Sequence, residues 1–278
     1  MASPGAPAPR SYSLAHLTVL SLPPPQVVAV AARSGYDCAG LRLLPAMPGG
    51  TAYPLMDDAR LLRETLSRIN STGVAILDLE IVRIDRQFDA RGLLPFLEAG
   101  SRLGARAVLV GADDRDQARL AQSFAALCDA ARPFGLTADI EFMPWTAVPD
   151  IGSAVRLVQA AGCPANAGVL VDALHFARSR SSLEEIGALP RSWLHYAQLC
   201  DAPAGIPATD AELIHTARSN RLLPGEGGID LRALCARLPV DLPLSIEIPN
   251  ESRLSALGPE AWARQALAAA RAATGSAQ

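Results

Sequence analysis

Residues 137–144 read TADIEFMP, so the carboxylate of Glu141 stands near the end of a largely apolar, strand-like run. An ionised carboxylate that leaves water needs a partner charge or a metal ion, because its desolvation otherwise outweighs any gain from packing. A glutamate at a strand end can also simply reach solvent or an arginine. Seven further runs decide between these readings, each near-continuously apolar as in strands buried on both faces: residues 16–20, 40–44, 74–82, 107–111, 168–172, 195–199 and 244–248.

Stretches rich in alanine, leucine and arginine, with helical periodicity, alternate with these strands. The clearest are residues 23–33, 57–70, 93–103, 115–132, 151–161 and 259–273. Alternating strands and helices indicate a parallel sheet, and eight such pairs predict a single (β/α)₈ barrel over residues 11–275, preceded by a loose tail at residues 1–10. A doubly wound open sheet is the alternative, but no GxGxxG turn follows the first strand. Residues 202–228 look irregular and are expected to shape a pocket between the last two strands.

The composition excludes several function classes. Half of the 278 residues are hydrophobic, and the formal net charge of −3 provides no basic field for nucleic-acid binding. The chain contains no lysine, so all 25 basic residues are arginine. A lysine Schiff base, a pyridoxal phosphate anchor and a Walker-type phosphate lysine are therefore excluded.

Cysteine usage and hydropathy bear on where the protein works. The five cysteines are scattered without a CxxC pair, and the Pro/Ala-rich start lacks the features of a signal peptide. No apolar run approaches the roughly 20 residues of a membrane span. We therefore expect a cytoplasmic protein without a membrane partner; homo-oligomerisation stays open.

Polar residues at the ends of four consecutive predicted strands indicate a metal site. In a barrel of this kind the active site lies at the carboxyl ends of the strands, and there the chain places Glu141, Asp172, Gln198 and Glu247. Three converging carboxylates would repel one another without a compensating cation. Their oxygen-rich set favours one divalent ion such as Mn²⁺, Mg²⁺ or Co²⁺, with open positions for two vicinal substrate oxygens.

The segments IEFMP, VDALH, QLCDA and SIEIP give the chain a resemblance to the xylose-isomerase-like TIM-barrel superfamily of sugar phosphate isomerases and epimerases. In that superfamily a Glu, an Asp, a His and a Glu from strands five to eight hold one metal ion. The resemblance implies these roles for Glu141, Asp172, Gln198 and Glu247, with Gln198 replacing the histidine. Bacterial 3-dehydroshikimate dehydratases are similar in having glutamine there. His195 is the alternative ligand if the strand register differs, because both side chains cannot face inward on a regular strand.

Four further residues are candidates for contact with substrate or protons. His175 follows Asp172 in a DxxH pair, and Arg221 opens RLLPGEGGID, which resembles the superfamily's Arg-x-x-Pro-Gly-x-Gly segment. The resemblance implies a proton shuttle at His175 and a substrate contact at Arg221, against the simpler roles of a satisfied strand-end histidine and a solvated loop charge. Glu80 and His16 are weaker substrate-binding candidates, since Glu80 can equally pair with a nearby arginine.

These features together favour a metal-dependent isomerase or epimerase of a small polyhydroxylated carbonyl compound. Glu141 and Glu247 resemble the paired carboxylates that act in the epimerases as ligand and acid/base on opposite faces of the substrate carbon. The alternative is a dehydratase of a cyclic hydroxyketone such as 3-dehydroshikimate. An abasic-site endonuclease shares the barrel but needs many histidines and a basic face, and the chain has four histidines. A metal-free, non-catalytic barrel subunit is the remaining reading.

Overall fold

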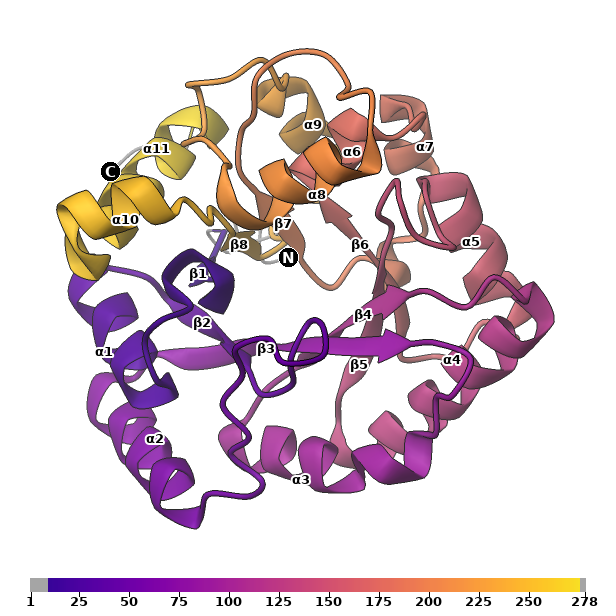
Figure 1. The fold of residues 1–278 in the computed structure, drawn as a ribbon, viewed down its shortest axis with the longest axis horizontal. Helices are drawn as coiled ribbons and strands as arrows, with labels where there is room; N and C mark the ends of the chain where they lie inside the picture. Colours follow the sequence, from indigo (N-terminus) through magenta and orange to yellow (C-terminus); the bar gives the residue numbers. More distant parts are fainter. Residues whose placement is uncertain (1–9, 276–278) are drawn as a thin grey trace, which may run out of the picture.

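The computed structural model describes residues 10–275, and these form a closed barrel of parallel strands (Figure 1). Each strand pairs with the one before it in the chain, and β8 closes the ring against β1. The strands are β1 Tyr12–Leu14, β2 Cys38–Arg42, β3 Ala75–Ile84, β4 Ala107–Ala112, β5 Thr137–Glu141, β6 Ala167–Asp172, β7 Ala197–Leu199 and β8 Leu244–Ile246. The predicted (β/α)₈ barrel is confirmed, and the alternative of an open sheet is wrong.

Helices surround the barrel on its outer side (Figure 1). The α-helices are α1 Pro24–Ser34, α2 Ala59–Thr72, α3 Leu94–Leu103, α4 Gln117–Ala131, α5 Ile151–Ala160, α6 Ala173–Arg178, α7 Leu183–Ala188, α8 Asp210–Ser219, α9 Leu231–Arg237, α10 Glu251–Leu257 and α11 Pro259–Thr274. Short 3₁₀ helices are η1 His16–Val19, η2 Ala90–Leu93, η3 Arg132–Phe134 and η4 Arg191–Trp193. Several helices begin at an aspartate whose side chain accepts from first-turn backbone N–H groups, as Asp58 and Asp150 do for α2 and α5.

The expected first strand at residues 16–20 is wrong. The strand that closes the ring is β1, in which Ser13 is in register with Cys38 on one side and Ser245 on the other. Residues His16–Val19 instead form η1, and Thr18 donates from Oγ1 to the carbonyl of Ile246 at 2.8 Å. Burial of His16, Thr18 and Val19 in this turn gives the same apolar appearance as a buried strand, which explains the error.

The segment at residues 202–228 is only partly irregular, because it contains α8. Thr209 caps that helix, and its hydroxyl and the Glu212 side chain satisfy each other's backbone N–H groups in a capping box. Figure 1 shows α8 lying over the barrel next to β7 and β8.

The barrel interior is partly polar. An apolar layer formed by Cys38, Leu77, Ile81, Ala107, Leu109, Leu170 and Tyr196 fills much of it. Near the starts of the strands, Asp139 contacts the ring of His195 at 2.6 Å. Gly168 makes this contact possible, since a Cβ at that position would collide with both side chains. A His–Asp pair therefore lies at the floor of the barrel and needs a glycine beside it.

Asp78 on β3 is an unusual member of this interior. Its side chain is fully buried, and neither carboxylate oxygen has a hydrogen-bond partner among residues 10–275. Burial raises the pKa of Asp78 well above its ordinary value, and the nearby Glu80 charge adds to the effect. Gly40 on the neighbouring strand leaves room for it, because a Cβ there would lie 2.9 Å from Asp78 Oδ1.

Only the end of the expected N-terminal tail can be placed. Residues 1–9 lie outside the described part of the chain, and Arg10 donates from Nη2 to the carbonyl of Pro239 at 2.9 Å. Within residues 10–275, no helix combines the length and the apolar character that crossing a membrane requires.

Candidate active site

Four predicted site residues lie together at the carboxyl ends of β5 to β8. Glu141 and Asp172 are the last residues of β5 and β6, Gln198 lies in β7 and Glu247 directly follows β8. The register pairs Asp172 with Gln198, and Gln198 with Ser245, so neighbouring strands bring these side chains to one level. All four are at most 4 % exposed.

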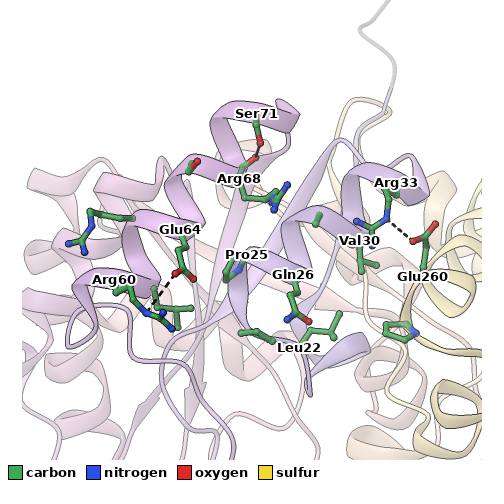
Figure 2. Close-up of a pocket in the computed structure, with 16 residues that line it drawn as sticks. Leu22, Pro25, Gln26, Val30, Arg33, Arg60, Glu64, Arg68, Ser71 and Glu260 are labelled. Carbon is green, nitrogen blue, oxygen red and sulfur yellow. Dashed lines mark hydrogen bonds and ion pairs between the residues drawn. The ribbon is translucent and has the colours of Figure 1, made fainter.

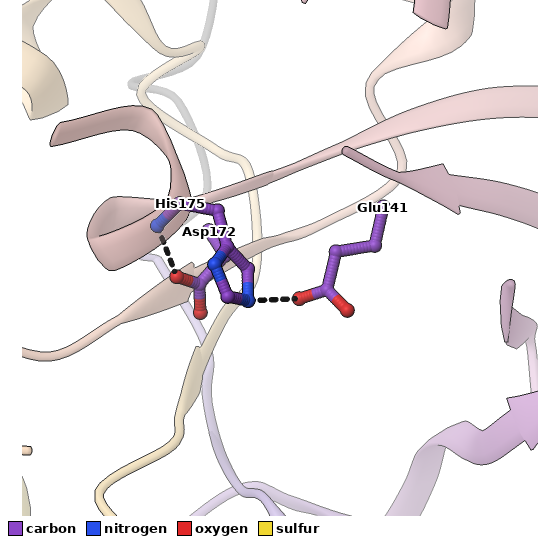
Figure 3. Close-up of side chains that lie close together, drawn as sticks. All are labelled: Glu141, Asp172 and His175. Atoms are coloured by element: carbon purple, nitrogen blue, oxygen red, sulfur yellow. Dashed lines mark hydrogen bonds and ion pairs between the residues drawn. The ribbon is translucent and has the colours of Figure 1, made fainter. Parts of the chain in front are cut away.

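The contacts among these side chains are direct. Gln198 donates from Nε2 to Glu247 Oε1 at 3.1 Å. His175 lies on the first turn of α6, and its backbone N–H donates to Asp172 Oδ1 at 3.0 Å. The ring nitrogen Nε2 of the same residue lies 3.6 Å from Glu141 Oε1 (Figure 3). Potential ligand atoms of Glu141, Asp172 and His175 all lie within 4.8 Å of one another. This trio is a candidate metal-binding cluster, and it includes a histidine for which the sequence indicated a proton-transfer role.

Arg221 provides the positive charge among these carboxylates. Its Nη1 lies 2.6 Å from Asp172 Oδ2 and its Nη2 lies 2.8 Å from Glu247 Oε2, and the residue is 2 % exposed. Nε donates to the carbonyl of Ala217 at 2.9 Å, which fixes the plane of the guanidinium. The reading of Arg221 as a solvated loop charge is therefore wrong, since the residue is a buried partner of two proposed ligands.

Several buried polar atoms around this cluster have no hydrogen-bond partner within residues 10–275. They are Glu141 Oε1, His175 Nδ1 and Gln198 Oε1. Buried polar groups are rarely left unpaired, because each lost hydrogen bond costs about 1–3 kcal/mol. Because the amide nitrogen of Gln198 is used by Glu247, its oxygen is free to ligate a cation. The donor set therefore fits a divalent metal ion.

Burial dominates the electrostatics of the cluster. It raises the pKa of Glu141 well above its ordinary value and that of Glu247 to about 7, although the Arg221 charge opposes the latter shift. Asp172 differs, because the Arg221 charge and the hydrogen bonds from Arg221 and the His175 backbone outweigh burial and hold the pKa of Asp172 below its ordinary value. Burial lowers the pKa of His175 to about 4, so its imidazole is neutral at pH 7.

A cavity of about 190 Å³ lies above these residues. Glu141, His175, Arg221 and Glu247 belong to its wall, together with apolar side chains such as Trp145. The Trp145 ring meets the His175 ring edge-on with centroids 5.2 Å apart. The volume is below the 300–1,000 Å³ that is usual for drug-sized ligands, which suits a small metabolite.

The structure places Gln198 and His195 at different levels of the barrel. Gln198 contacts the carboxylate cluster, whereas His195 precedes β7 and contacts Asp139 at the floor. His195 is therefore outside the group formed by Glu141, Asp172 and Glu247.

His16 and Glu80 lie behind the cavity wall. The ring nitrogens of His16 contact the carbonyl of Leu22 at 2.9 Å and the backbone N–H of Arg42 at 2.7 Å. Glu80 accepts from the His16 backbone at 2.9 Å and from Arg42 Nη2 at 2.7 Å. Neither residue lines the cavity, so both position Arg42, which does line it.

Asp201 organises the loop that carries the RLLPGEGGID segment. Its Oδ2 accepts from the backbone N–H groups of Gly225 at 2.9 Å and Gly227 at 3.0 Å, and its Oδ1 accepts from Ile229 at 3.1 Å. A Cβ on Gly227 would collide with Asp201, so this glycine is required for the close approach. The sequence showed the glycines but did not identify the aspartate that they serve.

Three further arginines, which the sequence pattern did not indicate, also belong to the cavity wall: Arg42, Arg83 and Arg218. They come from β2, β3 and α8, and the only available signal was the position of Arg42 and Arg83 near predicted strand ends. A second hollow, of about 1170 Å³, lies on the outer surface between α1 and α2 (Figure 2). It shares no lining residue with the site, and two of its arginines are paired, Arg33 with Glu260 and Arg60 with Glu64.

Comparison with solved structures shows the same architecture in other proteins. An IOLI protein with a bound zinc atom has a TM-score of 0.77 and 18 % identity, covering 95 % of this chain and 97 % of that one. A xylose isomerase domain protein from Alicyclobacillus acidocaldarius has a TM-score of 0.76 and 19 % identity, and the match covers 96 % of this chain and 98 % of that one. A D-allulose 3-epimerase from Methylomonas sp., in complex with D-allulose, has a TM-score of 0.67 and 14 % identity, and the match covers 96 % of this chain and 98 % of that one.

Sequence comparison adds the family. No curated protein sequence matches the chain. A family profile described as "Xylose isomerase-like TIM barrel" matches residues 28–273, nearly the whole barrel and most of the segments that carry the candidate site. The chain therefore belongs to the xylose isomerase-like TIM barrel family.

Proposed function

We propose that the protein is a divalent-metal-dependent isomerase or epimerase of a small polyhydroxylated carbonyl compound. The observation that carries the proposal is the convergence of Glu141, Asp172, Gln198 and Glu247 beneath a small cavity, where the buried oxygens Glu141 Oε1 and Gln198 Oε1 have no hydrogen-bond partner within residues 10–275. The zinc atom in the IOLI protein and the sugar in the allulose epimerase support a metal site and a small sugar-like substrate.

The four residues would hold one Mn²⁺, Mg²⁺ or Co²⁺ ion, and His175, which lies next to Glu141 and Asp172, is kept for proton transfer. When bound, such an ion supplies an electrophile that stabilises negative charge developing on a substrate carbonyl oxygen. Gln198 is held by its hydrogen bond to Glu247, and its buried amide oxygen has no partner among residues 10–275, so it would be the ligand atom.

Proton transfer falls to Glu141 and Glu247, which come from strands on different sides of the mouth. A group exchanges protons best when its pKa is near the working pH, and burial raises the pKa of Glu247 to about 7. Glu141 has the neutral His175 ring 3.6 Å away, which can receive or return a proton through Nε2. One carboxylate removes the proton next to the carbonyl, and the other delivers a proton to the product.

Arg221 orients the substrate in this proposal. Its guanidinium lies at the cavity wall and already joins Asp172 to Glu247, so its remaining N–H directions can meet a substrate oxygen. The apolar wall around Trp145 and Met143 excludes water from the reacting carbon.

The proposal is tested by metal-dependent deuterium exchange. The protein is incubated in D₂O with Mn²⁺ or Mg²⁺ and ketoses such as D-fructose or D-allulose, and NMR monitors the hydrogen next to the carbonyl. We expect metal-dependent exchange that falls by at least 10²-fold in Glu141→Gln, comparable to loss of a catalytic acid or base. Glu98→Gln, an exposed carboxylate, is the matched control. Equal exchange in both variants would remove Glu141 from the chemistry.

Gln198 favours a second candidate, a dehydratase of a cyclic hydroxyketone. The same proton abstraction followed by loss of a β-hydroxyl gives elimination, and the dehydratases that this site resembles have glutamine in strand seven. Incubation with 3-dehydroshikimate and Mn²⁺, followed by ultraviolet absorbance of an aromatic product, tests it. Absorbance that appears with wild type and disappears in Glu141→Gln would identify a lyase; no absorbance would remove this substrate.

A further inference from the structure

The wall of the cavity contains four arginines in addition to its carboxylates. Arg42, Arg83 and Arg218 line it in addition to Arg221, whereas Glu141 and Glu247 are the carboxylates in its wall. Arg221 is paired with Asp172 and Glu247 and is already assigned to the metal site. The other three arginines, here called the arginine rim, have no role in the metal site or in the proton transfers.

Arg218 has no carboxylate partner within residues 10–275. In the described part of the chain, its side chain donates one hydrogen bond, from Nη1 to the sulfur of Met47 at 3.4 Å, although the residue is only half-exposed. Burial and the charges of Arg83 and Arg42 lower the pKa of Arg218, and Asp113 opposes this only weakly. A partly buried guanidinium facing two like charges is unfavourable unless something negative joins it.

The other two members of the rim are anchored but not saturated. Arg83 donates from Nε to Asp113 Oδ2 at 2.6 Å. Gly111 leaves room for the Arg83 side chain, because a Cβ on residue 111 would lie 3.3 Å from Arg83 Nη1. Arg42 donates from Nη2 to Glu80, while its buried Nε has no partner among the described residues. Each arginine thus holds a fixed position and keeps donors for a ligand.

We propose that the substrate carries an anionic group, a carboxylate or a phosphate, and that Arg218, together with Arg83 and Arg42, receives it at the cavity mouth. This inference rests on the proposed function, because it assigns the far end of the molecule whose carbonyl faces the carboxylate cluster. Guanidinium groups match carboxylate and phosphate geometry by paired N–H donors, whereas a neutral sugar would leave the charge of Arg218 uncompensated.

The balance of charge around the cavity supports the same conclusion. Arg42, Arg83 and Arg221 are paired with the carboxylates of Glu80, Asp113, Asp172 and Glu247, so Arg218 is the arginine of the cavity wall without a carboxylate partner among the described residues. A divalent ion beside the carboxylate cluster would add two positive charges. An anionic substrate compensates for this added charge, and the cavity of about 190 Å³ is small enough to place the two ends of such a molecule near the ion and near Arg218.

The test is calorimetric titration of the Mn²⁺-loaded protein with ligands that share one skeleton: dihydroxyacetone, dihydroxyacetone phosphate and hydroxypyruvate, plus inorganic phosphate. We expect at least one anionic hydroxyketone to bind about tenfold more tightly than dihydroxyacetone, the usual value of a charge-assisted hydrogen bond. Arg218→Gln should remove this preference, and Arg232→Gln, which changes an exposed arginine, should retain it. Raised ionic strength should weaken only the anionic ligands.

The outcomes separate this inference from the proposed function. Preference for dihydroxyacetone phosphate or for hydroxypyruvate identifies phosphate or carboxylate as the recognised group. Equal affinities for neutral and anionic ligands, no binding of any probe, or equal losses in Arg218→Gln and Arg232→Gln would overturn the inference. Failure of the proposed function would instead appear as absent Mn²⁺ binding or absent deuterium exchange, whatever the anion preference.

Discussion

At the scale of single residues, Arg221 explains how two of the three buried carboxylates, Asp172 and Glu247, can be tolerated without a metal ion. Its two contacts to Asp172 and Glu247 supply charge where a divalent ion would otherwise be the main compensation. Removing one member of a buried ion pair is costly, because the remaining charge stays desolvated. The residue therefore has a structural function in addition to its proposed contact with substrate.

We predict that Arg221→Met destabilises the metal-free protein by about 3–5 kcal/mol, as expected for a broken buried ion pair. Urea unfolding in the presence of a chelator measures the change. Mn²⁺ should restore more stability to this variant than to wild type, because the ion replaces the lost charge. Arg264→Met, which removes an exposed i,i+4 pair with Glu260, should cost at most about 1 kcal/mol. Equal costs in the two variants would contradict this account.

Asp78 leads to a prediction about pH. Because burial raises its pKa in the folded state, the folded protein binds more protons than the unfolded chain at this group. Its contribution to stability is therefore present below its unfolded pKa of about 3.9 and is lost as pH rises toward the folded value. Asp78→Asn removes this loss. We expect the stability of the variant relative to wild type to increase from about pH 5 to pH 8 by about 1 kcal/mol or more.

Chemical denaturation at several pH values tests the Asp78 prediction. Asp57→Asn, which changes an exposed carboxylate, should show no comparable trend. A flat difference between Asp78→Asn and wild type would mean that the carboxyl group finds partners, such as buried water, that preserve its ordinary pKa.

At the scale of strands and helices, the sequence predicted the strand ends well and the side-chain partners poorly. Apolar runs that have Glu141, Asp172 and Gln198 at or next to their ends are sufficient to place those residues at one edge, because parallel strands share a direction. The first strand was misplaced because residues 16–20 are apolar as a result of burial, and a buried 3₁₀ turn gives the same apolar run as a buried strand. Partners such as Asp201 with Gly225 depend on loop paths that no periodicity reveals.

The arginine rim illustrates the same limit. Arg42, Arg83 and Arg218 are far apart in the sequence, and only the closed barrel with α8 over its mouth brings them to one cavity. A sequence reader sees 25 arginines with no means of separating these three from solvated ones. The partner of an arginine side chain depends on the folded chain, whereas the end of a strand can be predicted from the local sequence pattern.

Strand β6 yields a prediction about packing. Gly168→Ala places a methyl group against Asp139 and the His195 ring, so it should break the His–Asp contact and destabilise the protein by about 1–3 kcal/mol. Urea unfolding measures the loss. Gly92→Ala, where a Cβ would meet nothing within 4 Å, should stay within about 0.5 kcal/mol of wild type. Comparable losses of stability in Gly168→Ala and Gly92→Ala would contradict the clash expected at Gly168.

At the scale of the whole molecule, a bound ion should stabilise the barrel by mass action. At a Mn²⁺ concentration one hundredfold above its dissociation constant, we expect about 2.7 kcal/mol, visible as an increase in thermal midpoint that a chelator reverses. Glu141→Gln should lose most of this increase, since it removes a proposed ligand. Equal increases in both proteins would place the stabilising ion elsewhere.

Closure of the ring by β8 against β1 also governs how the chain must be made. Ser13 leaves the ribosome long before its partner Ser245, and at about 5–20 residues per second the delay is on the order of tens of seconds. Throughout that interval the first strand has an unsatisfied edge, which is a template for wrong association. Synthesis in cells should therefore depend on chaperones more than refolding of the finished chain at high dilution does.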